Sequence, residues 1–123
     1  MKQINAKGAP PAIGPYSHAV VTKNLIFLSG QIPIDPDTGE LISADISNQT
    51  KQVIKNISAI LAELDKSFLN IVKTTCFLTD MSNFAIFNKI YERAFISFPA
   101  RSCVEVKELP KKALVEIELI VEA

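Results

Sequence analysis

The chain of 123 residues contains few of the side chains that most often carry chemistry, with one histidine and two cysteines. A metal-independent ribonuclease usually needs two general acid/base groups, commonly a pair of histidines or a histidine with a glutamate. His18 alone makes that arrangement hard to build, and its plain interpretation is a polar residue near the start of a strand. Cys76 and Cys103 lie in separate apolar segments, which is typical of free thiols in an intracellular protein rather than of a disulfide scaffold.

Net charge and long hydrophobic runs are also lacking. Lysine plus arginine balances aspartate plus glutamate at 13 each, so the chain has no net attraction for phosphate backbones or anionic membranes. The longest apolar runs, such as residues 25–28 (LIFL), are far too short to span a bilayer. The first residues (MKQINAKG) lack the apolar stretch of a secretory signal. We therefore expect a cytoplasmic protein that binds neither membranes nor nucleic acid.

Metal and phosphate motifs are absent as well. Neither cysteine has a C-x-x-C partner, and Asp35 and Asp37 fall in a turn without the remaining ligands of a calcium loop. The chain has no G-x-x-x-x-G-K and no G-x-G-x-x-G phosphate loop. If the protein is an enzyme, it is expected to work without a metal or nucleotide cofactor.

Five β-rich runs predict strands. Lys23 and Asn24 separate the first two runs and predict a two-residue hairpin turn. Ahead of them, residues 8–16 (GAPPAIGPY) hold three prolines, which cannot donate ladder hydrogen bonds, so this segment is expected to be an ordered but irregular arm. The predicted strands cover residues 19–22, 25–29, 72–79, 102–106 and 114–121.

Two amphipathic helices separate these strands. Apolar residues at spacings of three and four predict the first helix over residues 47–65, with Ser47 as its N-cap. Asp80 or Ser82 caps the second helix, which ends before Pro99. The apolar stripe of this second helix consists of Phe84, Phe87, Tyr91 and Phe95.

The order β-β-α-β-α-β-β predicts a single α+β domain over residues 1–123, with two helices on one face of a mixed sheet. Two helices can cover only one face. In residues 114–121 the even positions place Leu114 and Ile120 on the same face as Glu116 and Glu118. The uncovered face is therefore too apolar for water, and we expect a homo-oligomer that buries it.

A few residues are candidates for chemistry. Arg101 can hold a carboxylate through its bidentate fork, and Glu116 lies mid-strand where burial raises a carboxyl pKa toward acid/base use. Tyr16 follows a Gly-Pro turn, and Cys103 shares the strand face of Arg101. Structural roles are the alternatives: a solvent-facing glutamate, a packing cysteine, a tyrosine lid on the core, or an ion pair of Arg101 with Glu116 or Glu118.

Read together, these segments resemble the reactive intermediate deaminase A family, also called the RidA, YjgF or L-PSP family. The resemblance covers nearly the whole chain, and its most specific part surrounds Arg101. The matching segments are residues 12–17 (AIGPYS), 29–33 (SGQIP), 71–75 (IVKTT), 83–85 (NFA), 88–91 (NKIY), 99–106 (PARSCVEV), 109–110 (LP) and 115–118 (VEIE).

The resemblance implies a chorismate-mutase-like fold and a homotrimer with clefts at the subunit interfaces. It also implies a 2-iminobutanoate/2-iminopropanoate deaminase that needs no cofactor. Such an enzyme hydrolyses short-lived enamines and imines, such as 2-aminoacrylate, to 2-keto acids and ammonia.

The resemblance also assigns roles to individual residues. Arg101 binds the substrate carboxylate, and Glu116 activates a water and then moves a proton to the departing ammonia. Cys103 has no histidine partner in the sequence and is a poor candidate for a covalent nucleophile. The remaining pocket residues implied by the resemblance are Tyr16, Ser29, Gly30, Asn88 and Cys103.

Two other functions stay open. One is a non-catalytic regulatory trimer in which Arg101 captures a small carboxylate metabolite. The other is an endoribonuclease or translation inhibitor, against which the neutral charge, the single histidine and the missing basic stripe all count. The connection over residues 91–99 is shorter than in many relatives, which affects the rim of the cleft.

Overall fold

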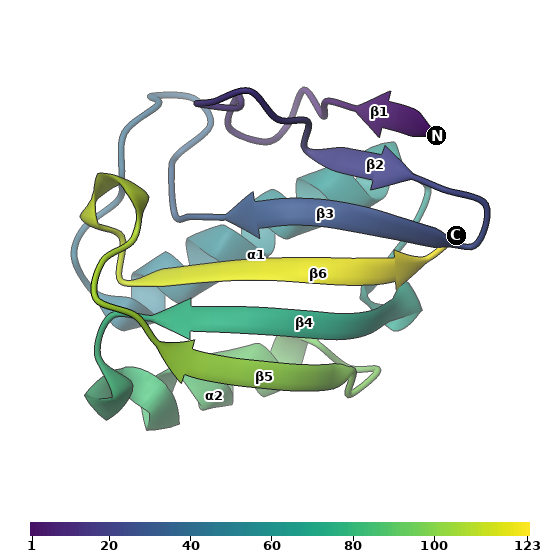
Figure 1. Cartoon of the computed structure of the whole chain (residues 1–123). Helices are drawn as coiled ribbons and strands as arrows, with labels where there is room; N and C mark the ends of the chain where they lie inside the picture. The colour runs from purple at the N-terminus through teal and green to yellow at the C-terminus, as the bar shows by residue number, and fades with distance from the viewer.

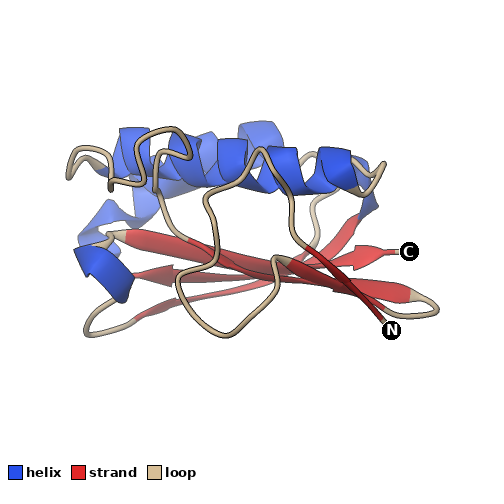
Figure 2. Ribbon diagram, turned by 90° about the horizontal axis from the view of Figure 1, so that it is seen from above, coloured by secondary structure: helices blue, strands red, loops and turns tan.

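A computed structural model covers residues 1–123 and forms a six-stranded sheet in the order β1-β2-β3-β6-β4-β5, with two α-helices on one of its faces (Figures 1 and 2). Neither helix is long and apolar enough to cross a membrane. The elements are β1 (Lys2–Ile4), β2 (Ala19–Val21), β3 (Leu25–Gln31), α1 (Ile46–Glu63), β4 (Ile71–Leu78), α2 (Phe84–Ala94), β5 (Ala100–Glu105) and β6 (Val115–Glu122).

The sheet is mixed, as predicted. Strand β4 pairs with β5 in parallel, and every other neighbouring pair is antiparallel. A parallel pair needs a crossover connection, and α2 supplies it between β4 and β5. The α+β fold class expected from the sequence is therefore confirmed.

The core lies between the sheet and the helices. Strand β6 buries its odd-numbered side chains, including Val115 and Ile117, against helix α1 residues such as Val53 and Ile57. The opposite face has no helix over it (Figure 2). On that face Phe27 is 43% exposed, although it is a large apolar side chain. The prediction of one covered and one uncovered face is confirmed.

Several boundaries differ from the prediction. Strand β1 was not predicted, because three residues at a sheet edge give too short a pattern; it pairs with β2 ahead of the irregular arm. Strand β3 continues to Gln31, and the predicted turn at Lys23 and Asn24 is confirmed. Strand β5 begins at Ala100 rather than at residue 102, so Arg101 lies within the strand.

The N-cap of α1 is Asp45, and the prediction of Ser47 was wrong. The Oδ1 atom of Asp45 accepts a hydrogen bond from the backbone N–H of Ser47 at 2.8 Å. Of the two caps proposed for the second helix, Asp80 is the one used; it caps a short 3₁₀ turn that leads into α2.

The C-terminus of α1 closes in a Schellman motif. The N–H of Asp65 donates to the carbonyl of Ala62, and the N–H of Lys66 donates to the carbonyl of Leu61. This arrangement places Asp65 in the left-handed region at φ 55°. Glycine is the residue that adopts this conformation without a steric penalty.

We predict that Asp65→Gly raises the free energy of unfolding by about 0.5 to 1 kcal/mol, because it relieves the left-handed penalty. Urea denaturation measures this change. Glu63→Gly is the matched control: its position is the last residue of α1, where glycine costs about 0.5 to 1 kcal/mol. Equal destabilisation by both substitutions would contradict the assignment.

Candidate functional site

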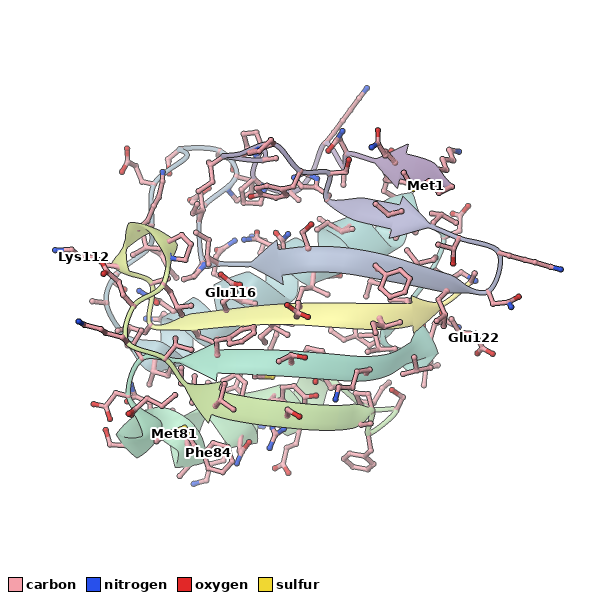
Figure 3. The ribbon with its side chains drawn as sticks, in the orientation of Figure 1. Met1, Met81, Phe84, Lys112, Glu116 and Glu122 are labelled. Atoms are coloured by element: carbon pink, nitrogen blue, oxygen red, sulfur yellow. The ribbon has the colours of Figure 1, made fainter.

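Glu116 lies at the bottom of a pocket of about 530 Å³ on the uncovered side of the sheet. Figure 3 shows Glu116 on β6, below the arm that runs between β1 and β2. Three of the residues predicted to bind substrate, Tyr16, Ser29 and Gly30, line this pocket with it. The complete lining is Ile13, Gly14, Pro15, Tyr16, Ser29, Gly30, Ile32, Pro110 and Glu116.

The close approach of β3 to the Glu116 carboxyl requires glycine at position 30. A Cβ at this position would overlap the carboxylate, since it would lie 2.8 Å from the carboxyl carbon. The pairing of β3 with β6 is irregular between Leu28 and Gln31, which brings the Gly30 backbone over the carboxyl. The Ser29 hydroxyl donates to the carbonyl of Ser17 at 2.7 Å, so it ties the strand to the arm.

The environment of Glu116 favours its protonated form. Burial raises the pKa of this carboxyl above its ordinary value, and the negative charge of Glu118 raises it further. Glu118 lies two residues along β6 and therefore on the same face of the sheet. A carboxyl with a raised pKa holds a proton more readily than an ordinary one, and general acid/base catalysis uses carboxyls of this kind.

Arg101 lies in a second pocket, of about 340 Å³, between β5 and α2. Its Nη1 donates to Oδ1 of Asn88 at 2.8 Å. The guanidinium carbon lies 4.7 Å from the ring centroid of Tyr91 and 5.6 Å from that of Phe84. An amide oxygen and two aromatic faces contact the cation, and the carboxylate of Glu92 also lines the pocket. The contacts with neutral groups leave N–H donors for an incoming carboxylate.

The two pockets open on opposite faces of the sheet. Along β4, Thr74 lies beside Arg101 of β5, and Phe77 lies beside Glu116 of β6. Positions 74 and 77 differ by an odd number, so their side chains, and those of their partners, point to opposite faces. One chain therefore does not bring the two predicted catalytic residues together. The alternative of an ion pair between Arg101 and Glu116 or Glu118 within a chain is wrong for the same reason.

Cys103 shares the face of Arg101, as predicted, but it lines neither pocket. Its side chain is partly buried and packs against the core. Burial raises the pKa of the Cys103 thiol, and nearby Arg101 opposes this only in part. Burial also raises the pKa of its cross-strand neighbour Cys76, to about 12. Both thiols are therefore protonated at neutral pH and are poor nucleophiles.

The aromatic bracket around Arg101, made by Phe84 and Tyr91, was missed in the sequence. Both residues were assigned to the apolar stripe of the second helix. One feature of the sequence could have indicated it. Asn88 is a polar residue within the apolar stripe, on the same helix face as positions 84 and 91, and a polar side chain there suggests a polar partner such as Arg101. The Tyr91 hydroxyl also shares a hydrogen bond of 2.7 Å with the Thr74 hydroxyl, which fixes the ring beneath the guanidinium.

His18 lies directly before strand β2, which confirms its plain interpretation as a polar residue near the start of a strand. It is 3% exposed, and both ring nitrogens bond to backbone atoms of the arm. No group of three or more histidine, cysteine, aspartate or glutamate side chains is arranged to hold a metal ion.

We predict that Glu118→Gln lowers the pKa of Glu116, because it removes the like charge that stabilises the protonated form. Carbon-detected NMR titration of the Glu116 carboxyl measures this shift. Glu122→Gln is the matched control. Glu122 lies on the same face of β6, about 20 Å from Glu116, which is beyond the Debye length at physiological ionic strength. A fall of the same size in both variants would contradict the pairwise effect of Glu118.

Comparison with known proteins agrees with the fold. Residues 6–123 match the family described as endoribonuclease L-PSP. A RutC family protein of Pyrococcus abyssi is 52% identical over 118 residues, which make up 95% of this chain and 93% of the relative. The human protein named 2-iminobutanoate/2-iminopropanoate deaminase is 44% identical over 118 residues, covering 95% of this chain and 86% of the human one.

A solved structure, that of E. coli TdcF with bound serine, superimposes with a TM-score of 0.94 at 39% identity and covers 100% of this chain and 99% of its own. Both the sequence matches and the structural agreement extend over nearly the full length of the chain. The chain therefore belongs to the RidA family, also known as the YjgF or L-PSP family.

Proposed function

We propose that this protein is a cofactor-independent 2-iminobutanoate/2-iminopropanoate deaminase. The observation that carries the proposal is the guanidinium of Arg101, which is held open for a carboxylate by Asn88, Tyr91 and Phe84. The raised pKa of Glu116 supplies the acid/base group that the hydrolysis needs. The human relative that carries the name of this activity supports the assignment.

We further propose that the active unit is a homotrimer with its clefts between subunits. Each cleft would combine the Glu116 pocket of one copy with the Arg101 pocket of a neighbouring copy. Two observations support this: the two residues lie on opposite faces of one sheet, and the face that carries Glu116 exposes large apolar side chains such as Phe27. A cytoplasmic location remains a prediction from the sequence.

In this proposal the reaction is an addition of water followed by loss of ammonia. An enamine such as 2-aminoacrylate first tautomerises to its imine, and Arg101 binds the carboxylate and orients the imine carbon. The imine enters protonated on nitrogen, and Glu116 takes a proton from the water as the water oxygen bonds to the imine carbon. Glu116 then returns this proton to the nitrogen, the carbon–nitrogen bond breaks as the hydroxyl proton leaves to solvent, and the products are a 2-keto acid and ammonia.

Regulatory binding without catalysis is the second candidate. A related structure holds serine, which has the same α-carboxylate as the proposed substrates. Arg101 would serve such binding equally well, whereas binding alone does not require a proton carrier at Glu116. An endoribonuclease, the activity in the family description, is less well supported. The net charge is zero, and both nitrogens of the single histidine are bonded to the backbone.

We predict that the wild-type protein suppresses semicarbazide trapping of 2-aminoacrylate that a serine dehydratase releases in situ. Arg101→Ala lowers kcat/KM about 100-fold or more, because it removes a bidentate charged contact to the substrate. Arg93→Ala is the matched control; Arg93 is an exposed arginine on α2 that lines neither pocket. Unchanged trapping with folded wild-type protein would reject this activity for the three-carbon substrate.

Glu116→Gln separates catalysis from binding in the same assay. The amide keeps the shape of the carboxyl but cannot carry the proton, so kcat falls about 100-fold or more. Calorimetry with pyruvate, the expected product, then measures whether the carboxylate still binds. Full activity of this variant would favour a role for Glu116 other than proton transfer.

We predict that mixing two inactive variants restores activity if the clefts are composite. Arg101→Ala and Glu116→Gln are unfolded and refolded together at equal concentrations. About one quarter of the clefts then receive an intact Glu116 from one copy and an intact Arg101 from its neighbour. Mixing without refolding is the control. The absence of recovery in refolded trimers of the correct mass would contradict the composite cleft.

A further inference from the structure

Two side chains attach the arm, which we now define as residues 6–17: the Ser29 hydroxyl bonds to its last residue, Ser17, and the His18 imidazole bonds to its first half. The imidazole Nδ1 accepts a hydrogen bond from the backbone N–H of Ala6 at 2.9 Å, and its Nε2–H donates to the carbonyl of Pro10 at 2.7 Å. These partners fix the neutral Nε2–H tautomer, since an N–H can bond only to a nitrogen that lacks a proton. One side chain thus holds the arm at two points.

The middle of the arm has little else to hold it. Three prolines lack an N–H, and the bonds within this part join Tyr16 N–H to the Gly14 carbonyl and Ile13 N–H to the Tyr16 hydroxyl. Between residues 7 and 16, the bond from His18 to Pro10 is the only hydrogen bond to the rest of the protein. Burial of Ala9 and Pro10 adds apolar contact beside this bond.

The far part of the arm is a wall of the Glu116 pocket. Residues 13–16 line that pocket opposite Gly30 and Glu116, yet Ile13 is 53% exposed and Tyr16 44% exposed. Side chains this exposed gain little order from packing, so the position of the wall depends on how the arm is attached. The backbone of His18 also accepts from Ser29 N–H at 2.9 Å, which ties the attachment directly to strand β3 beside Gly30.

We propose that His18 is a positioning residue of the Glu116 pocket. Its imidazole sets the place of Tyr16 and Ile13 relative to the Glu116 carboxyl by holding the arm at Ala6 and Pro10. His18 does not touch the reacting atoms; it acts through the arm. The activity part of this inference rests on the proposed deaminase function, whereas the structural part does not.

A buried histidine that only stabilises the fold is the competing explanation. Its removal would lower the stability of the whole protein and leave the activity of each folded molecule unchanged. Gln49 offers a matched control for that case. It is also fully buried, and it bonds to the backbone of Ile42, Ser43 and Leu114, none of which lines the Glu116 pocket.

Fluorine NMR tests the position of the wall without any assay of activity. The chain has two tyrosines, Tyr16 and Tyr91, so 3-fluorotyrosine gives one signal from the pocket wall and one from the core. In His18→Ala the Tyr16 signal is expected to move to the position of a solvent-exposed, mobile ring, while the Tyr91 signal stays unchanged. Backbone amides of residues 12–17 are expected to exchange about 10-fold faster or more.

Kinetics of the same variants completes the test. His18→Ala is expected to lower kcat/KM about 10- to 100-fold per folded trimer, because a small displacement of pocket groups has this effect. His18→Gln is expected to recover both the Tyr16 signal and most of the activity, since its amide offers an acceptor and an N–H donor. Gln49→Ala is expected to lose stability without either change.

Each contrary result has a distinct meaning. An unmoved Tyr16 signal in folded His18→Ala overturns the proposal, and so does an activity loss of equal size in Gln49→Ala. Full kcat/KM with a mobile Tyr16 also overturns it, because the wall would then not matter to the reaction. An inactive wild-type protein rejects the deaminase function instead, and the Tyr16 signal still decides whether His18 positions the wall.

Discussion

Burial of one sheet face under α1 and α2 is the constraint on which the other features depend. Strand side chains alternate, so the apolar residues that face the helices determine where every intervening residue points. Val115 and Ile117 are fully buried, and Glu116 between them must face away from the helices. The same rule turns Arg101 toward α2 through the parallel pairing of β5 with β4. The location of both charged residues is therefore a consequence of core packing.

Within one chain, placement on opposite faces keeps Arg101 and Glu116 from forming an ion pair with each other. A guanidinium beside a carboxylate would pair with it, lower its pKa and lose its own free donors. Arg101 instead has the Asn88 amide and aromatic rings as neighbours, whereas Glu116 is half-buried beside the like charge of Glu118. In the single chain the guanidinium therefore keeps free donors, and the pKa of the Glu116 carboxyl stays raised. The fold keeps two opposite charges in one small domain without an ion pair between them.

The sequence was sufficient for the elements that have strong local patterns. Five strands and both helices were predicted, because β-branched runs and spacings of three and four residues are local signals. Strand β1 was missed because three residues carry no recognisable alternation; they form a strand only by pairing with β2. The choice of Asp45 over Ser47 as a cap depends on where the helix meets the core. The separation of Arg101 from Glu116 depends on how β5 and β6 are aligned with β4, and this alignment cannot be predicted from any short segment of the sequence.

Both edges of the sheet are poor templates for another strand. At one edge β1 is only three residues long. At the other, β5 follows directly after Pro99 and carries the charged side chains of Arg101 and Glu105. Growth by edge-to-edge pairing, the geometry of fibrils, is therefore disfavoured, while the uncovered face remains open to contact. Association through the uncovered face can form a closed ring of a few copies. Because both edges disfavour strand pairing, the chain is expected to form finite assemblies rather than polymers.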